Sequence, residues 1–432
     1  MHHPVYPVEA FYVAQRSRAV VSCTVHGDVD EKLLAASFTA KVAEHPSLGS
    51  RIERDGDGFR LRRLDEAELP GLLVRPNGAT ALAEESNTPL TAGGPLVRLV
   101  LLRGEDEHTL VLSVDHAICD GHSALALFEA LWLTCAALAD GTFTAPEPED
   151  GWPVPAAEQL PQRTEAEIEE YLARRVERTR RSPVVALPYE AAASAAAAPA
   201  PAGPVVAVER VLLQPEQTGR LLRFAKDEGV SLHGLVGSAL LLAVRRRLGA
   251  EPGPRPLGCM SPVDLRSRLD PPLGREVMVP AVAGYLDVLD VARDTDPLAL
   301  AREISGNLHG AIGRGDYVLE TRILTRVVDN PALLATSVVA TNLGRLSTPP
   351  APQGLRITDM RIVPFREQYY PQAGRGPLMA CVVSFDNRLS IELPYSTECF
   401  SHEQLQEIST GVHSTLLGFA ARAAAGSPAA TG

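Results

Sequence analysis

The chain has 432 residues, of which 45% are hydrophobic and 22% are charged, a composition typical of a folded globular protein rather than a disordered or fibrous one. Its 53 acidic and 41 basic residues give a net charge of −12, so it lacks the overall positive charge that favours nucleic acid or anionic membrane surfaces. At roughly 100–200 residues per domain, the length predicts two or three domains.

Cysteine usage and hydropathy restrict the cellular setting. The six cysteines include no C-x-x-C pair and no histidine neighbours at zinc-ligand spacing. The N-terminal residues do not combine a basic region with an apolar stretch, and no run of about 18 apolar residues occurs. We therefore expect a reduced, cytoplasmic protein with no metal site and no integral membrane association.

Strands and helices are mixed in the first half of the chain. The expected elements are a strand at 18–27, a helix at 29–44, a hairpin at 51–64, strands at 95–103 and 108–114, and helices at 122–141 and 164–181. Asp28 or Asp30 can cap the first helix, and Asp-Gly pairs supply the positive φ angles of the hairpin turn.

The composition changes abruptly at 186–204, where Ala and Pro predominate, and this segment is predicted to be a linker. Beyond it, the expected elements are strands at 205–213, before Pro262, and at 335–343, 378–385 and 388–393, with helices at 214–228, 231–248, 296–313 and 401–424. The prediction is an α/β protein with α+β layers, in which residues 1–185 and 205–432 form two halves of similar size.

The strongest local signal is the segment Ser-Val-Asp115-His116-Ala-Ile-Cys119-Asp120-Gly121, which lies between a strand and an apolar helix. A short loop of this kind holds a side chain firmly while leaving it free to project into a cleft. A histidine with an ordinary pKa near 6.5 is neutral at cytoplasmic pH and can accept a proton, so His116 is the candidate general base. The alternative is a loop histidine without a catalytic role.

The H-x-x-x-D-G pattern resembles the active-site motif of the condensation-domain and chloramphenicol-acetyltransferase superfamily of thioester-dependent acyltransferases. Two further segments resemble motifs of that superfamily: Ser-Pro-Val-Asp-Leu-Arg, which ends at Arg266, and Thr341-Asn342-Leu-Gly. Over essentially the whole chain, the sequence is most similar to stand-alone polyketide-associated acyltransferases of the phthiocerol/phthiodiolone dimycocerosyl transferase type.

The resemblance implies two chloramphenicol-acetyltransferase-like domains arranged in a V, with a tunnel between them where donor and acceptor meet at His116. It implies an O-acyltransferase that moves an acyl group from a coenzyme A or acyl-carrier-protein thioester to a hydroxyl of a polyketide-like metabolite, another secondary metabolite or a lipid. The thioester is a co-substrate, and no metal or redox cofactor is required. The expected partners are this donor and the small-molecule acceptor, and the expected oligomeric state is a monomer.

The resemblance also assigns roles to residues. His116 corresponds to the catalytic histidine, whereas Asp120, Gly121 and Arg266 are expected to be structural, with Asp120 and Arg266 as an ion pair. Thr341 and Asn342 are possible contacts in the tunnel or at the oxyanion.

Asp115 stands where the family usually has a first histidine. It is a further possible contact in the tunnel or at the oxyanion, could orient the loop, and through its charge could modestly raise the pKa of His116. Cys119 beside Asp120 also invites a cysteine-nucleophile hypothesis, which we consider weaker because free cysteine is more often a small buried apolar group.

Two alternatives to the O-acyltransferase stay open. The chain could be a stand-alone amide-forming condensation enzyme, which would use the same histidine with an amine acceptor. It could instead be a degenerate, non-catalytic module that binds carrier protein, a hypothesis raised by Asp115. The D-F-G-W-G element of many relatives has no match near Tyr369-Tyr370-Pro371, which argues against peptide-bond formation.

Overall fold

The computed structural model describes residues 2–147, 151–190, 205–251, 253–327, 330–367 and 375–425. The chain divides into two compact units. The first consists of Met1–Leu160, Asp264–Val282 and Leu346–Tyr369, and the second of Pro161–Val263, Ala283–Arg345 and Tyr370–Gly432. Neither unit is continuous in sequence.

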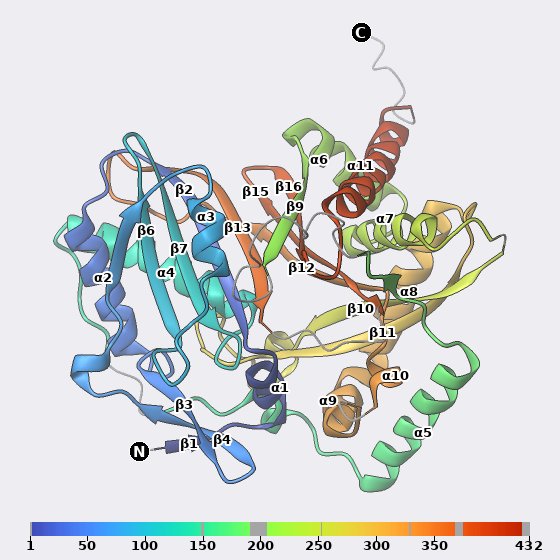
Figure 1. Ribbon diagram of the computed structural model, residues 1–432, viewed down its shortest axis with the longest axis horizontal. Helices are drawn as coiled ribbons and strands as arrows, with labels where there is room; N and C mark the ends of the chain where they lie inside the picture. Colours follow the sequence, from blue (N-terminus) through green and yellow to red (C-terminus); the bar gives the residue numbers. More distant parts are fainter. Residues whose placement is uncertain are drawn as a thin grey trace. The chain divides into compact units, whose positions relative to one another are not determined.

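The first unit is built around a five-stranded sheet in the order β13-β2-β7-β6-β5 (Figure 1). β2 (Ser17–His26) pairs antiparallel with β7 (Glu107–Asp115) along one edge and with β13 (Arg356–Arg366) along the other. β6 (Val97–Arg103) pairs antiparallel with β7, and β5 (Leu72–Pro76) joins β6 in parallel. β2 is therefore an interior strand only because β13 returns from far along the chain.

Alternation along β2 produces two different faces of this sheet. Ala19, Val21, Cys23 and Val25 are buried apolar residues on one face. Helix α4 (Gly121–Ala139) packs against β2 and against α2 (Glu31–Glu44), which begins after the N-cap Asp30. The opposite face is mixed: Val20 is buried there, whereas Arg18 donates to the backbone oxygen of Ser86, in α3 (Ala81–Asn87), at 2.7 Å.

Shorter elements complete the first unit. β1 (His2–Pro4), β3 (Ser50–Asp55) and β4 (Gly58–Arg63) form a small antiparallel sheet. Helix α1 (Pro7–Gln15) runs almost directly into β2, with Arg16 at a φ of 46° between them. The remaining turns are η1 (Glu66–Glu68), η2 (Ala156–Gln159) and η3 (Arg266–Arg268).

The second unit contains a six-stranded sheet in the order β11-β10-β12-β15-β16-β9. In chain order its strands are β9 (Val206–Leu213), β10 (Arg255–Asp264), β11 (Val282–Val291), β12 (Val338–Leu346), β15 (Leu378–Phe385) and β16 (Arg388–Ser396). Its main helices are α5 (Glu165–Arg181), α6 (Pro215–Asp227), α7 (Leu232–Arg247), α8 (Pro297–Arg314), α9 (Asp316–Val327), α10 (Pro331–Leu334) and α11 (His402–Ala425). A two-stranded sheet joins β8 (Leu187–Pro188) to β14 (Arg375–Gly376).

A core of apolar side chains fills the space around α7, which is buried along most of its length. α7 packs against α8 and α11, and α11 also packs against α6. The strands and helices expected from the sequence are confirmed in both units, with boundaries shifted by a few residues, and the mixed α/β class is confirmed.

The division into units differs from the two continuous halves expected from the sequence. Residues 161–185 belong to the second unit, whereas 264–282 and 346–369 belong to the first. The physical reason is backbone pairing, because the strand at 356–366 satisfies the open edge of β2. Of the expected linker 186–204, residues 191–204 lie outside the described residues, and Leu187 is buried in β8.

By length and composition, one described helix, α4, is long and apolar enough to cross a membrane, as is the bent pair of α6 and α7 taken together. Half of the apolar stretch of α4 is buried within the protein.

Candidate active site

The H-x-x-x-D-G segment forms the connection between β7 and α4 in the first unit. Asp115 is the last residue of β7, and its Oδ1 accepts a hydrogen bond from the backbone N of Ala117 at 2.9 Å. The backbone N of His116 donates to the oxygen of Ser17 at 2.9 Å, which extends the β7–β2 ladder by one residue. The start of the loop is thus fixed both by its own turn and by β2.

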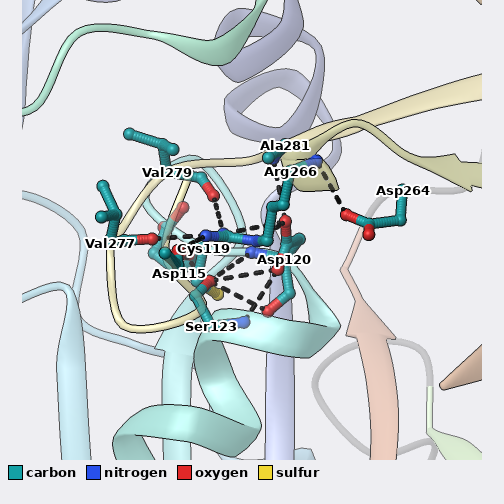
Figure 2. A network of polar contacts seen from close by, with 10 residues as sticks. Asp115, Cys119, Asp120, Ser123, Asp264, Arg266, Val277, Val279 and Ala281 are labelled. Carbon is teal, nitrogen blue, oxygen red and sulfur yellow. Dashed lines mark hydrogen bonds and ion pairs between the residues drawn. The ribbon is translucent and has the colours of Figure 1, made fainter. Parts of the chain in front are cut away.

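Asp120 fixes the other end of the loop (Figure 2). It is the N-cap of α4, and its Oδ1 accepts from the backbone N of Ser123 at 2.8 Å. Its Oδ2 accepts from Nε and Nη2 of Arg266 at 3.2 and 3.0 Å and from the backbone N of Ala281 at 2.9 Å. The ion pair expected between Asp120 and Arg266 is present, and both side chains are buried.

Arg266 has further partners besides Asp120. Its guanidinium donates to the backbone oxygens of Gly274, Val277 and Val279, so segment 264–282 closes around it (Figure 2). Gly121 is the first residue of α4 and does not have a positive φ, so its backbone angle does not require glycine.

The imidazole of His116 is held by an aromatic contact. It stacks on the ring of Tyr12, in α1, with 4.1 Å between ring centroids and 12° between planes. Nδ1 is buried and has no hydrogen-bond partner among the described residues. Tyr12 was not among the residues selected from the sequence, since nothing in the segment Pro-Val-Glu-Ala-Phe-Tyr marks a helix that reaches this loop.

Burial lowers the pKa of His116 to about 4, with Arg366 also lowering it and Asp120 opposing the change. The base is therefore unprotonated at neutral pH. The expectation that Asp115 raises this pKa is wrong, because desolvation of the ring dominates and the carboxylate that favours its charged form is Asp120.

Asp115 lies on the opposite face of the sheet from His116. It is paired with Arg18 of β2, and the two side chains project from the same face. Burial raises its pKa to about 6, while Arg18 lowers it. The carboxylate of Asp115 accepts a hydrogen bond from the backbone of its own loop, which agrees with the loop-orienting role considered from the sequence.

Cys119 is fully buried, and its Sγ lies 3.4 Å from the backbone oxygen of Asp115. Burial and the neighbouring carboxylates raise the pKa of its thiol well above the usual value. A thiolate is therefore strongly disfavoured, which argues against Cys119 as a nucleophile.

Thr341 and Asn342 lie on β12 of the second unit and are half-buried. Oδ1 of Asn342 accepts from the backbone N of Gly344 at 3.0 Å, and Gly344 has a φ of 77°. Asn342 therefore stabilises a turn of its own strand, and the substrate contacts suggested for both residues stay a prediction.

Two cavities lie beside the loop within the first unit. One of about 160 Å³ is lined by the charged side chains of Arg16, Arg18, Asp115 and Glu367 together with small polar and apolar residues. The other, of about 20 Å³, contains Glu9, whose pKa burial raises to about 7. Within the described ranges, no group of three or more His, Cys, Asp or Glu side chains could hold a metal ion.

Two family models match the chain, one over its N-terminal part and one over its C-terminal part. The condensation-domain model covers residues 14–251, more than half of the sequence. The chain belongs to the condensation-domain family. The model of the phthiocerol/phthiodiolone dimycocerosyl transferase C-terminus covers residues 202–394.

Curated relatives extend over most of this condensation-domain protein. A phthiocerol/phthiodiolone dimycocerosyl transferase from Mycobacterium ulcerans (strain Agy99) is 27% identical over 395 residues, 88% of each chain. Its counterpart from Mycobacterium leprae (strain TN) is 29% identical over 320 residues, 70% of this chain and 72% of that one. Like these relatives, the chain is an acyltransferase.

Solved structures share the fold. Polyketide synthase associated protein 5 from Mycobacterium tuberculosis aligns with a TM-score of 0.71 and 22% identity, covering 96% of this chain and 98% of that one. A trichothecene 15-O-acetyltransferase from Fusarium sporotrichioides aligns with a TM-score of 0.72 and 12% identity, covering 97% and 95%. At these identities the similarity concerns the fold.

Proposed function

We propose that this acyltransferase moves an acyl group from a coenzyme A or acyl-carrier-protein thioester to a hydroxyl of a polyketide-like metabolite, another secondary metabolite or a lipid. The observation that carries the proposal is His116, an unprotonated imidazole fixed at the end of β7 in an H-x-x-x-D-G loop. The names of the curated relatives, which are transferases to phthiocerol and phthiodiolone, favour a hydroxyl acceptor.

The proposed reaction is direct transfer. The acceptor oxygen attacks the thioester carbonyl carbon while its proton passes to His116, and the carbonyl electron pair moves onto oxygen. The tetrahedral intermediate then collapses: the carbon–sulfur bond breaks, and His116 returns the proton to the departing thiolate. A hydroxyl has a pKa far above that of His116, so proton removal must accompany attack.

Asp120 and Arg266 support this chemistry as structural residues. Their ion pair ties the N-terminus of α4 to segment 264–282 and so fixes the loop that carries His116. In this proposal the thioester is a co-substrate, and the protein acts as a cytoplasmic monomer with no further cofactor.

The first test is a product assay with purified enzyme, a short-chain acyl-coenzyme A and a mixed panel of alcohols and amines. We expect ester formation by the wild type and a rate lower by about 10²–10⁴-fold in His116→Ala, because general-base catalysis contributes about this much. Cys119→Ala is the matched control from the same loop and is expected to stay active.

Exclusive amide formation would move the assignment to the condensation alternative. Binding of carrier protein without turnover would instead identify a non-catalytic module. His116→Ala activity within a few-fold of wild type would contradict the mechanism.

A further inference from the structure

The strand register places Arg366 in the same row as His116. Arg366 is the last residue of β13 and is paired with Ser17 of β2. On the other side of β2, His116 donates its backbone N–H to the oxygen of the same Ser17. Side chains in one cross-strand row project from the same face, so Arg366, Ser17 and His116 share a face of the sheet.

The separation along this row is within reach of an arginine. Neighbouring strands lie about 4.7–4.9 Å apart, so the backbones of Arg366 and His116 are about 10 Å apart with β2 between them. The adjacent row, Phe365, Arg18 and Asp115, projects from the opposite face. Arg366 is therefore the cation that shares a face with His116, whereas Arg18 projects from the other face.

Arg366 has unused hydrogen-bonding capacity. Its Nε is buried without a partner, and among the described residues no carboxylate forms an ion pair with its guanidinium. Nε of Arg18 also lacks a partner, but the terminal nitrogens of Arg18 bind Glu367 and the backbone oxygen of Ser86. The charged groups that act on His116 are Arg366 from β13 and Asp120 from its own loop; the contacting ring of Tyr12 is kept neutral by its raised pKa.

We propose that Arg366 is a catalytic residue of the acyl transfer, whose guanidinium donates a hydrogen bond to the thioester carbonyl oxygen and stabilises the negative charge that forms there. This inference rests on the proposed function. Attack by the acceptor converts the carbonyl oxygen to an oxyanion while His116 gains a proton, and collapse removes both charges. A fixed cation favours the oxyanion and, before the reaction, keeps the imidazole unprotonated.

The test compares wild type, Arg366→Gln, Arg366→Lys and, as a matched control, Arg356→Gln at the exposed far end of the same strand. We expect kcat of Arg366→Gln to fall by about 10²-fold with little change in KM, as for loss of one oxyanion donor. Arg366→Lys should recover part of the rate, and Arg356→Gln should match wild type.

An NMR titration of the histidine ring carbons provides a readout that does not depend on turnover, with His116→Ala identifying the His116 signal. We expect the pKa of His116 to rise in Arg366→Gln and to stay unchanged in Arg356→Gln. Arg366→Gln with kcat within threefold of wild type, a loss confined to KM, or an unchanged His116 pKa would overturn the inference. If the wild type forms no ester, the proposed function fails, whereas the titration still reports whether Arg366 acts on His116.

Discussion

The protonation state of His116 determines the pH range of the enzyme. Its pKa is lowered to about 4, so the unprotonated base predominates at every pH well above that value. With chemistry rate-limiting, we predict that kcat/KM stays level from pH 8 to about 5.5 and falls only as the pH approaches 4.

This prediction is checked with an alcohol acceptor across the pH range, with far-UV circular dichroism at each pH to confirm folding. The contribution of His116 to native stability should decrease as the pH falls below about 6.5, because the imidazole takes up a proton more readily in the unfolded chain than in the native protein. The raised pKa values of Asp115 and Glu9 act in the opposite direction. If kcat/KM instead falls with a midpoint near pH 6.5 while the enzyme stays folded, the imidazole of His116 is solvated in solution and the prediction is wrong.

Among single residues of the site, the sequence predicted those that lie in short recognisable motifs. His116, Asp120 and Arg266 could be found because the segments that carry them resemble motifs of a known family, and the ion pair that the resemblance implies between the last two is observed. Tyr12 and Arg366 could not, because their approach to His116 depends on the path of α1 and on the register of β13.

The connection between α4 and segment 264–282 depends on a buried charge. Asp120→Asn leaves the Arg266 guanidinium facing a neutral amide, and we predict a loss of about 3–5 kcal/mol in the free energy of unfolding because a buried cation loses its partner. Glu129→Gln is the matched control: it lies on the same helix and removes an exposed ion pair with Arg275, so it should cost about 0–1 kcal/mol.

Urea denaturation of both variants measures the difference. Equal stability of Asp120→Asn and Glu129→Gln would mean that the three backbone oxygens around Arg266 already compensate its charge.

Among the elements, β13 shows why some structure is invisible in a sequence. Ile357, Met360 and Ile362 are buried and share a face, but their spacing is three residues and then two. A bulge between Ile357 and Asp359 accounts for the extra residue, so the strand lacks the strict alternation that predicts a strand. β7 and β9 could be predicted because no bulge interrupts their pattern.

For the molecule as a whole, the two units interleave along the chain. Residues 1–185 alone would leave the edge of β2 unpaired and Asp120 without Arg266. We predict that this fragment does not unfold cooperatively by itself, and that co-expression with residues 205–432 restores a soluble complex. Circular dichroism melts and co-purification through a tag on one fragment measure both outcomes, and a fragment 1–185 as stable as the full chain would contradict the prediction.

The sequence predicted the α/β class, because composition and periodicity are local properties. It did not predict which segments join which unit, since the pairing of β13 with the distant strand β2 leaves no signal in the composition. The V arrangement and the tunnel implied by family resemblance stay predictions.

The bulge in β13 also determines where the chain can change length. With Thr358 accommodated outside the ladder, Asp359 pairs with Thr24 and every later residue keeps its partner, up to Arg366 opposite Ser17. A chain that lost Thr358 would straighten the strand and still present Arg366 beside the loop. A chain that kept Thr358 but drew it into the ladder would present Phe365 instead. Whether the bulge is kept or absorbed thus decides whether a cation or an aromatic ring stands opposite Ser17, with no substitution at the site itself.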